Sequence, residues 1–210
     1  MEAIKTINLT KYYGKARGIV DLNLSVGRGE FFGFIGPNDA GKSTTIRTLL
    51  GLISPSAGSA QIFGLDIMKE KEAILHNIGY LPSEAVFYPG MRVKDILKLS
   101  ADMRKMNCAD EAKKLCERLQ LDTSRKVEDL SFGNRKKVAI VCALQSKPKL
   151  LILDEPTGGL DPLMQREFFD IIREGKIIAC NSVEVLSKTN ARRITVHGSV
   201  ALSFDAKKIL

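Results

Sequence analysis

The stretch of sequence that decides the fold is Gly36-Pro37-Asn38-Asp39-Ala40-Gly41-Lys42-Ser43-Thr44. It satisfies the pattern G-x-x-x-x-G-K-[ST], in which a glycine-rich loop ends in lysine and a hydroxyl residue. An apolar run precedes it at residues 31–35, and a helical pattern follows at residues 44–50. Between a strand and a helix, successive backbone N–H groups and the helix N-terminus point at one anion. The stretch therefore predicts a phosphate-binding loop, since a plain glycine-rich turn would not require Lys-Ser at this place.

The last residues of this loop also predict what it binds. In such loops the lysine reaches the β- and γ-phosphates of a nucleotide, and the hydroxyl residue binds Mg²⁺. Lys42 and Ser43 occupy these two positions. We therefore expect a nucleotide with its Mg²⁺ ion as the ligand.

A second motif is Lys149-Leu150-Leu151-Ile152-Leu153-Asp154-Glu155. Its apolar run is too short to span a membrane, so it predicts a buried strand of a parallel sheet. The run ends in two adjacent acids, and buried strands seldom do so without a cation or a substrate to balance the charge. We expect Asp154 to hold Mg²⁺ through water and Glu155 to polarise the water that attacks the γ-phosphate.

Three further segments carry a resemblance to a known family. They are Leu130-Ser131-Phe132-Gly133-Asn134, Pro156-Thr157-Gly158-Gly159-Leu160-Asp161 and Lys11-Tyr12-Tyr13-Gly14. Together with the two motifs above, they resemble the ATP-binding cassette (ABC) ATPases in order and spacing over residues 2 to about 172. LSFGN stands where this family carries its LSGGQ signature, which caps the ATP of the opposite subunit in a head-to-tail dimer. The second segment resembles the family's D-loop, and the third resembles the segment whose aromatic residue stacks on adenine.

The resemblance implies an α/β fold of the P-loop NTPase type, with a parallel core sheet, an antiparallel β lobe and a helical insertion. It implies ATP and Mg²⁺ as ligands, with Tyr13 at the adenine and Glu155 as the catalytic base. Ser131 and Gly133 would contact the γ-phosphate bound to the partner subunit. The metal ligands would be Ser43 and Asp154. The phosphates would lie against Gly36, Pro37, Asn38, Asp39, Ala40, Gly41, Lys42, Ser43 and Thr44.

The domain organisation follows from the same resemblance. It places an ABC ATP-binding domain at residues 1–172, with a helical subdomain at about 85–130. Apolar spacing predicts two helices of that subdomain at residues 93–106 and 109–121. Residues 173–210 would be a truncated C-terminal remainder.

The junction at the start of this remainder suggests a deletion. The segment 171–178 reads Ile-Ile-Arg-Glu-Gly-Lys-Ile-Ile, which continues a helix and also resembles the strand-turn-strand that follows the family's switch histidine. That histidine is missing, since the two histidines of the chain, His76 and His197, stand elsewhere. An internal deletion of a central strand, the histidine and a helix explains the pattern. A natural compact variant is the alternative.

Two further departures from the family pattern bear on function. Asp39 stands where the family's phosphate loop carries a glycine, and its carboxylate would oppose the phosphates and weaken nucleotide binding without abolishing it. After the run Tyr80-Leu81-Pro82, where the family often carries a glutamine that binds Mg²⁺, the chain has Ser83 and Glu84 as oxygen donors. The wording LPSE resembles a branch of antibiotic and multidrug exporter ATPases.

Composition and charge fit one globular domain. The chain has 210 residues, of which 44% are hydrophobic and 27% charged, enough for one core and a small subdomain. No apolar run approaches the roughly 20 residues that span a bilayer, the N-terminus lacks a secretory segment, and the four cysteines show no metal-binding spacing. The net charge of +8 is dispersed in short clusters such as Arg135-Lys136-Lys137, which is typical of a solvated surface. With 6% aromatic residues and no aromatic-basic stripe, no nucleic-acid partner is expected.

The resemblance to the ABC ATPases implies an ATP-binding subunit that hydrolyses ATP to drive export through a separate transmembrane permease. It would pair with a second ATP-binding subunit and lie in the cytoplasm, peripherally on the inner face of the cell membrane. Asp39 and the missing histidine predict weak hydrolysis. A non-catalytic nucleotide-binding or decaying regulatory subunit is the open alternative. A chromosome-maintenance or repair ATPase would need long heptad arms before the signature, and a paired-cassette translation factor would need a second cassette, so both are disfavoured.

Overall fold

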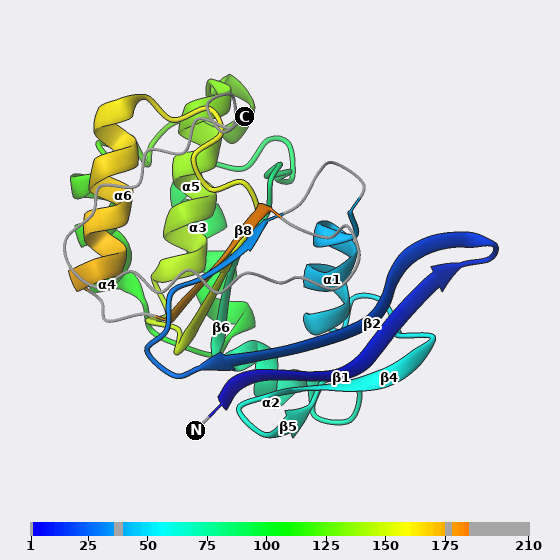
Figure 1. Cartoon of the computed structure of the whole chain (residues 1–210). Helices are drawn as coiled ribbons and strands as arrows, with labels where there is room; N and C mark the ends of the chain where they lie inside the picture. Colours follow the sequence, from blue (N-terminus) through cyan, green and yellow to red (C-terminus); the bar gives the residue numbers. More distant parts are fainter. Residues whose placement is uncertain (1, 36–39, 175–177, 185–210) are drawn as a thin grey trace.

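The computed structural model of the chain (Figure 1) describes residues 2–35, 40–174 and 178–184. These residues form two four-stranded sheets with helices around them. Four residues of the phosphate loop, Gly36 to Asp39, lie outside the described residues, and so does His197.

The core sheet is parallel, with the strand order β3-β8-β7-β6. Its strands are β3 (Phe32–Ile35), β8 (Ile178–Glu184), β7 (Leu150–Leu153) and β6 (Ile78–Leu81). All four residues of β7 are buried, as expected for a strand that has a neighbour on each edge and other elements on each face. The predicted parallel core is confirmed.

The sheet has an interior strand at the place from which the predicted deletion would remove one. Strand β8 occupies the position between β3 and β7, and it is built from residues that follow the junction at 171–178. The facing edges of β3 and β7 carry backbone groups that need partners, and the short apolar segment after the junction supplies them. Of the two readings of residues 171–174, the structure has the helix, since α6 (Pro162–Glu174) runs through them. Residue 172, the predicted end of the ATP-binding domain, lies inside this helix. The deletion itself stays a prediction.

The second sheet is the predicted antiparallel lobe, with the order β2-β1-β4-β5. Its long strands are β1 (Glu2–Tyr13) and β2 (Ala16–Gly27), and its short ones are β4 (Ala57–Ile62) and β5 (Leu65–Asp66). Gly14, with a φ of +58°, makes the tight turn between the two long strands. Figure 1 shows this lobe extending to the lower right, away from most of the helices.

The helical subdomain contains both predicted helices, α3 (Val93–Met103) and α4 (Ala109–Arg118). Each ends a few residues earlier than its apolar spacing indicated. Lys105 and Gln120, with φ values of +54° and +52°, adopt the left-handed conformation that commonly ends a helix. Three short elements were not predicted: β5, α2 (Lys71–His76) and the 3₁₀ turn η1 (Val127–Asp129).

Strand β7 joins two hydrophobic clusters. Leu151 and Leu153 pack with the helices α3, α4, α5 (Phe132–Leu144) and α6, which lie together at the upper left of Figure 1. Leu150 and Ile152 pack with the β lobe and with α1 (Lys42–Leu49). The alternation follows from the period of two along a strand. The acids at the end of β7 therefore stand on a strand that is held from both faces.

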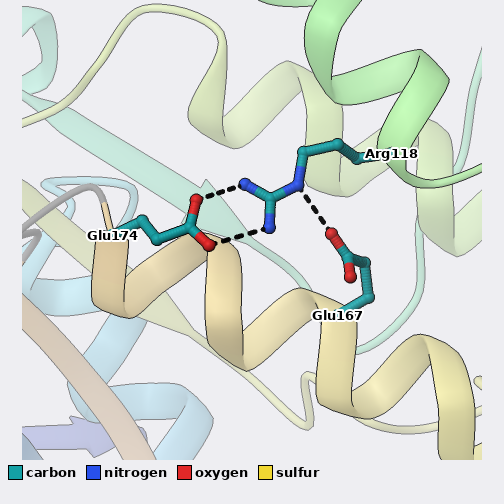
Figure 2. Close-up of polar contacts among 3 residues, drawn as sticks. All are labelled: Arg118, Glu167 and Glu174. Carbon is teal, nitrogen blue, oxygen red and sulfur yellow. Dashed lines mark hydrogen bonds and ion pairs between the residues drawn. The ribbon is translucent and has the colours of Figure 1, made fainter.

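A charged contact connects the helical subdomain to α6 (Figure 2). The guanidinium of Arg118 on α4 donates from Nε to Glu167 at 2.6 Å. Its two terminal nitrogens donate to both carboxylate oxygens of Glu174, at 2.6 and 3.2 Å. Glu174 is the last residue of α6, so the contact holds this helix at its C-terminal end, where the described chain stops before β8 resumes.

Candidate nucleotide site

The described part of the phosphate loop, Ala40 to Thr44, leads directly into α1. Gly41 has a φ of +84°, and a Cβ at this residue would lie only 2.5 Å from the carbonyl oxygen of Gly18 on β2. Only glycine accepts both the positive φ and the close strand. The first N–H groups of an α-helix have no acceptor within the helix, so the start of α1 is a place where an anion can bind.

The metal ligands that the sequence predicts lie together. The hydroxyl of Ser43, in the first turn of α1, donates to Oδ2 of Asp154 at 3.3 Å. Asp154 follows β7 directly, and its backbone N–H donates to the carbonyl oxygen of Leu81 on β6 at 2.8 Å. A hydroxyl and a carboxylate oxygen at the edge of a parallel sheet are ligands that suit Mg²⁺ bound to a nucleotide. The residues present therefore fit the ion.

The environment of Asp154 also suits a cation. The side chain is only 6% exposed. Burial raises the pKa of its carboxyl group above the ordinary value, and the hydrogen bond from Ser43 acts in the opposite direction. A bound cation would stabilise the ionised form that burial disfavours.

Glu155, the candidate catalytic base, is adjacent to Asp154 but is exposed to solvent. Its backbone has a φ of +49°, which is uncommon for a residue with a side chain and is found at functional sites. The turn that follows is closed by a hydrogen bond from the N–H of Gly158 to the carbonyl oxygen of Glu155 at 3.3 Å. Two neighbouring carboxylates thus have different environments, one buried beside α1 and one open to water.

Tyr13, the candidate adenine residue, lies near the start of α1. Its Cε2 and the Cγ2 of Thr44 both come within 3.3 Å of the point that a Cβ of Gly18 would occupy. The ring is 47% exposed, and Lys11 Nζ stands 5.4 Å from its centroid. The structure therefore brings the aromatic residue and the phosphate loop to the same place, although 31 sequence positions separate Tyr13 from Thr44.

The signature residues pack against the D-loop of their own chain. Ser131 caps α5, since its Oγ accepts from the N–H of Asn134 at 3.3 Å. A Cβ at Gly133 would lie 2.5 Å from the carbonyl oxygen of Gly159, and one at Gly159 would lie 2.2 Å from the ring of Phe132. The ring of Phe132 is half exposed and covers the D-loop backbone. The two loops therefore form one surface.

Lys136 does not belong to the solvated surface that the sequence predicted for it. Grouped with its basic neighbours as a solvated cluster, it is in fact 1% exposed, and its Nζ donates to the carbonyl oxygens of Pro82 at 2.9 Å and Ser83 at 3.0 Å. Ile140 and Ala143, which follow at helical spacing on α5, are buried too. Because Lys136 shares this spacing, it lies on the inner face of α5. The spacing is the signal in the sequence from which its burial could have been predicted.

These elements define the class of the protein. A glycine-rich loop between a parallel strand and a helix, with a hydroxyl and a carboxylate meeting beside it, is the nucleotide site of a P-loop α/β protein. The family model described as ABC transporter matches residues 19–158. The chain belongs to the ABC transporter family.

Individual relatives agree with this assignment. The bacitracin transport ATP-binding protein BcrA of Bacillus licheniformis is 40% identical over 192 residues, which cover 88% of this chain and 62% of the relative. A probable ABC transporter ATP-binding protein of Azorhizobium caulinodans is 32% identical over an aligned length of 223, which covers 99% of this chain and 79% of the relative. A solved ATP-binding subunit of an ABC transporter has a TM-score of 0.81 and 30% identity, covering 88% of this chain and 80% of that one.

The chain spans less than two thirds of the length of the BcrA relative. Within the part of the chain that the structure describes, no helix has the length and apolar character needed to cross a membrane.

Proposed function

We propose that this chain binds Mg-ATP and hydrolyses it slowly, as the ATP-binding subunit of a transporter whose membrane permease is a separate polypeptide. The observation that carries the proposal is the meeting of Ser43 and Asp154 at 3.3 Å, beside the start of α1 and next to an exposed Glu155. An ordinary hydrophobic core does not require a hydroxyl and a carboxylate at this place. Both are suitable ligands for a Mg²⁺ ion bound to a triphosphate.

In the proposed reaction, Tyr13 stacks on the adenine, and the loop from Gly36 to Thr44 holds the phosphates. Mg²⁺, bound by Ser43 and Asp154, would neutralise phosphate charge. Glu155 accepts a proton from the attacking water, a role that its exposure allows. Lys42 stabilises the charge on the β- and γ-phosphates.

The signature surface supports a dimer of ATP-binding subunits. Ser131 and Phe132 are exposed, and Gly133 is held at the surface by the D-loop. Such a surface suits the nucleotide of a second subunit, where Ser131 and Gly133 would contact the γ-phosphate. Hydrolysis would then require two subunits.

The proposed permease contact lies after β6 and on α3. Val86, Tyr88 and Met103 are 85%, 72% and 79% exposed, and Leu99 is partly exposed. Large apolar side chains in this number on one subdomain suit a protein partner. A subunit bound there to a permease would lie in the cytoplasm on the inner face of the membrane. The wording LPSE and the likeness to BcrA favour export as the direction of transport.

Weak hydrolysis is part of the proposal. Strand β8 has no histidine, and neither do the residues that follow it up to His197. The proposed deletion would account for the missing switch histidine. A purely regulatory subunit that binds nucleotide without hydrolysis is the second candidate, and Asp39 favours it.

The experiment is a Mg-ATP titration combined with a hydrolysis assay on wild type and Glu155→Gln. Both proteins should bind ATP equally, because the carboxamide keeps the size of the side chain but cannot accept the proton. Both should turn over near background, because one member of a cooperating set is already missing. Failure of both to bind Mg-ATP would overturn the assignment. Robust hydrolysis by wild type that collapses in Glu155→Gln would overturn the claim of weak hydrolysis, since another group would then replace the histidine.

A further inference from the structure

Lys136 on α5 is buried in an unusual way for a lysine. Lysine side chains normally keep the ammonium group in water even where the stem is covered. Here the whole residue is 1% exposed, and it is among the largest fully buried side chains of the described residues. Removing an ammonium group from water is costly, so the contacts that it makes in return are informative.

Those contacts are made to the segment that leaves β6. Nζ donates to the carbonyl oxygens of Pro82 and Ser83, at 2.9 and 3.0 Å. The preceding carbonyl, that of Leu81, accepts from the backbone N–H of Asp154 at 2.8 Å. Three consecutive carbonyl oxygens are therefore held, the first by the end of β7 and the next two by α5.

The charges of two carboxylates favour the protonated form of Lys136. Burial lowers the pKa of Lys136, and the charges of Asp154 and Glu155 act against that shift. The charge of Lys136 in turn favours the ionised form of Asp154, against the effect of burial. The charge of the ammonium group thus interacts with the acids at the carboxyl edge of β7, where the nucleotide site is proposed.

We propose that Lys136 is a positioning residue, which fixes residues 82–88 against α5 and the carboxyl edge of β7. Through this segment it connects the exposed side chains of Val86 and Tyr88 with the acids at the nucleotide site. The inference rests on the proposed function for its role in the reaction. The contacts themselves exist without a nucleotide, so they can be tested separately.

The test compares amide hydrogen exchange in wild type, Lys136→Met and Lys136→Gln, all without nucleotide. Methionine keeps much of the volume but leaves the two carbonyl oxygens without their donor, and glutamine keeps a shorter, uncharged donor. Exchange of the Asp154 N–H, which donates to the carbonyl oxygen of Leu81 next to the two held carbonyls, should become at least tenfold faster in Lys136→Met and less so in Lys136→Gln. Exchange in β7 and in the second half of α5 should stay within twofold of wild type. Lys137→Met, which removes the same charge from the next residue of the helix, is the matched control and should change neither.

A second measurement addresses the reaction. With the permease present to raise turnover, Lys136→Met should lower kcat at least fivefold and change KM by less than twofold, because the segment positions groups without binding ATP. Unchanged exchange of the Asp154 N–H, or equally faster exchange throughout the protein, would overturn the positioning role and leave only a structural one. Unchanged kcat in a protein that hydrolyses ATP would overturn the connection with the reaction. If wild type binds no ATP, the proposed function fails, while the exchange measurement still decides the contact.

Discussion

The two parts of the proposed nucleotide site differ in how they are held. The edge that carries Ser43 and Asp154 is closed: its side chains hydrogen-bond to each other, and β7 is packed on both faces. The signature turn at Ser131 and Gly133 is open: it rests on the D-loop backbone and faces solvent. The difference supports the proposal that each subunit binds one nucleotide at its closed edge and presents its signature turn to the nucleotide of a second subunit.

Damage to the two parts should have different consequences. A change at the closed edge should affect binding by the isolated subunit. A change at the signature turn should affect the local packing and the pairing of subunits, and leave nucleotide affinity alone.

The largest effect is expected at the loop lysine. Lys42→Met should weaken Mg-ATP binding by about a hundredfold, since hydrogen bonds to charged groups contribute about 1.5–3 kcal/mol each and a tenfold change corresponds to about 1.4 kcal/mol. A nucleotide titration measures the change. Lys69→Met, an exposed lysine in the turn before α2, is the control and should bind as wild type. Equal affinity of Lys42→Met and wild type would mean that the closed edge, with Lys42 beside Ser43 at the start of α1, does not bind the nucleotide.

The next effect is expected at the open part. Gly133→Ala should lower the free energy of unfolding by about 1–3 kcal/mol, the usual cost of overpacking, because the new Cβ would lie 2.5 Å from a backbone oxygen. Urea unfolding measures it. The control is Gly158→Ala in the same loop, whose Cβ would have only an ordinary contact at 3.6 Å. Affinity of the monomer for ATP should not change, and a large loss of affinity would show that the two parts are not separate.

A gain is expected at Asp39, which lies in the loop but outside the described residues. A carboxylate about 5 Å from a phosphate charge costs about 3 kcal/mol at an effective dielectric constant near 20, and Lys42 and Mg²⁺ offset part of it. Asp39→Gly should therefore tighten Mg-ATP binding at least tenfold, and Asp39→Asn should recover part of that gain. The titrations are done at low salt and repeated at higher salt, which should reduce the difference. Identical affinities in the three proteins would contradict the electrostatic explanation.

The smallest effect is expected at the contact between α4 and α6. Arg118→Met removes hydrogen bonds to two glutamates, but the guanidinium is one third exposed and Glu174 is 64% exposed, so solvent screens the pairs. The loss of unfolding free energy should be about 1 kcal/mol or less. Thermal unfolding measures it, with Lys5→Met, an exposed pair of the β lobe, as the control that should lose still less. A loss several times larger would mean that α6 and β8 depend on the helical subdomain for their position.

The sequence by itself determined the elements whose signal is local. The phosphate loop, the apolar strand that ends in two acids, the two helices of the subdomain and the antiparallel lobe follow from residue types at short spacing. Few functions other than phosphate binding require glycine, lysine and serine in that order. The apolar pattern of a buried strand can be read directly from the sequence. The parallel core sheet and the family followed from the same motifs.

Only the tertiary structure decided which distant residues meet. It placed Ser43 against Asp154, brought Tyr13 beside Thr44, and buried a lysine that the sequence placed among solvated charges. It also filled the interior of the core sheet with β8, at the place from which the predicted deletion would remove a strand. The physical reason is common to these cases. A strand position or a buried charge is settled by the partners that long-range packing provides, and backbone groups at an open strand edge accept any suitable segment within reach.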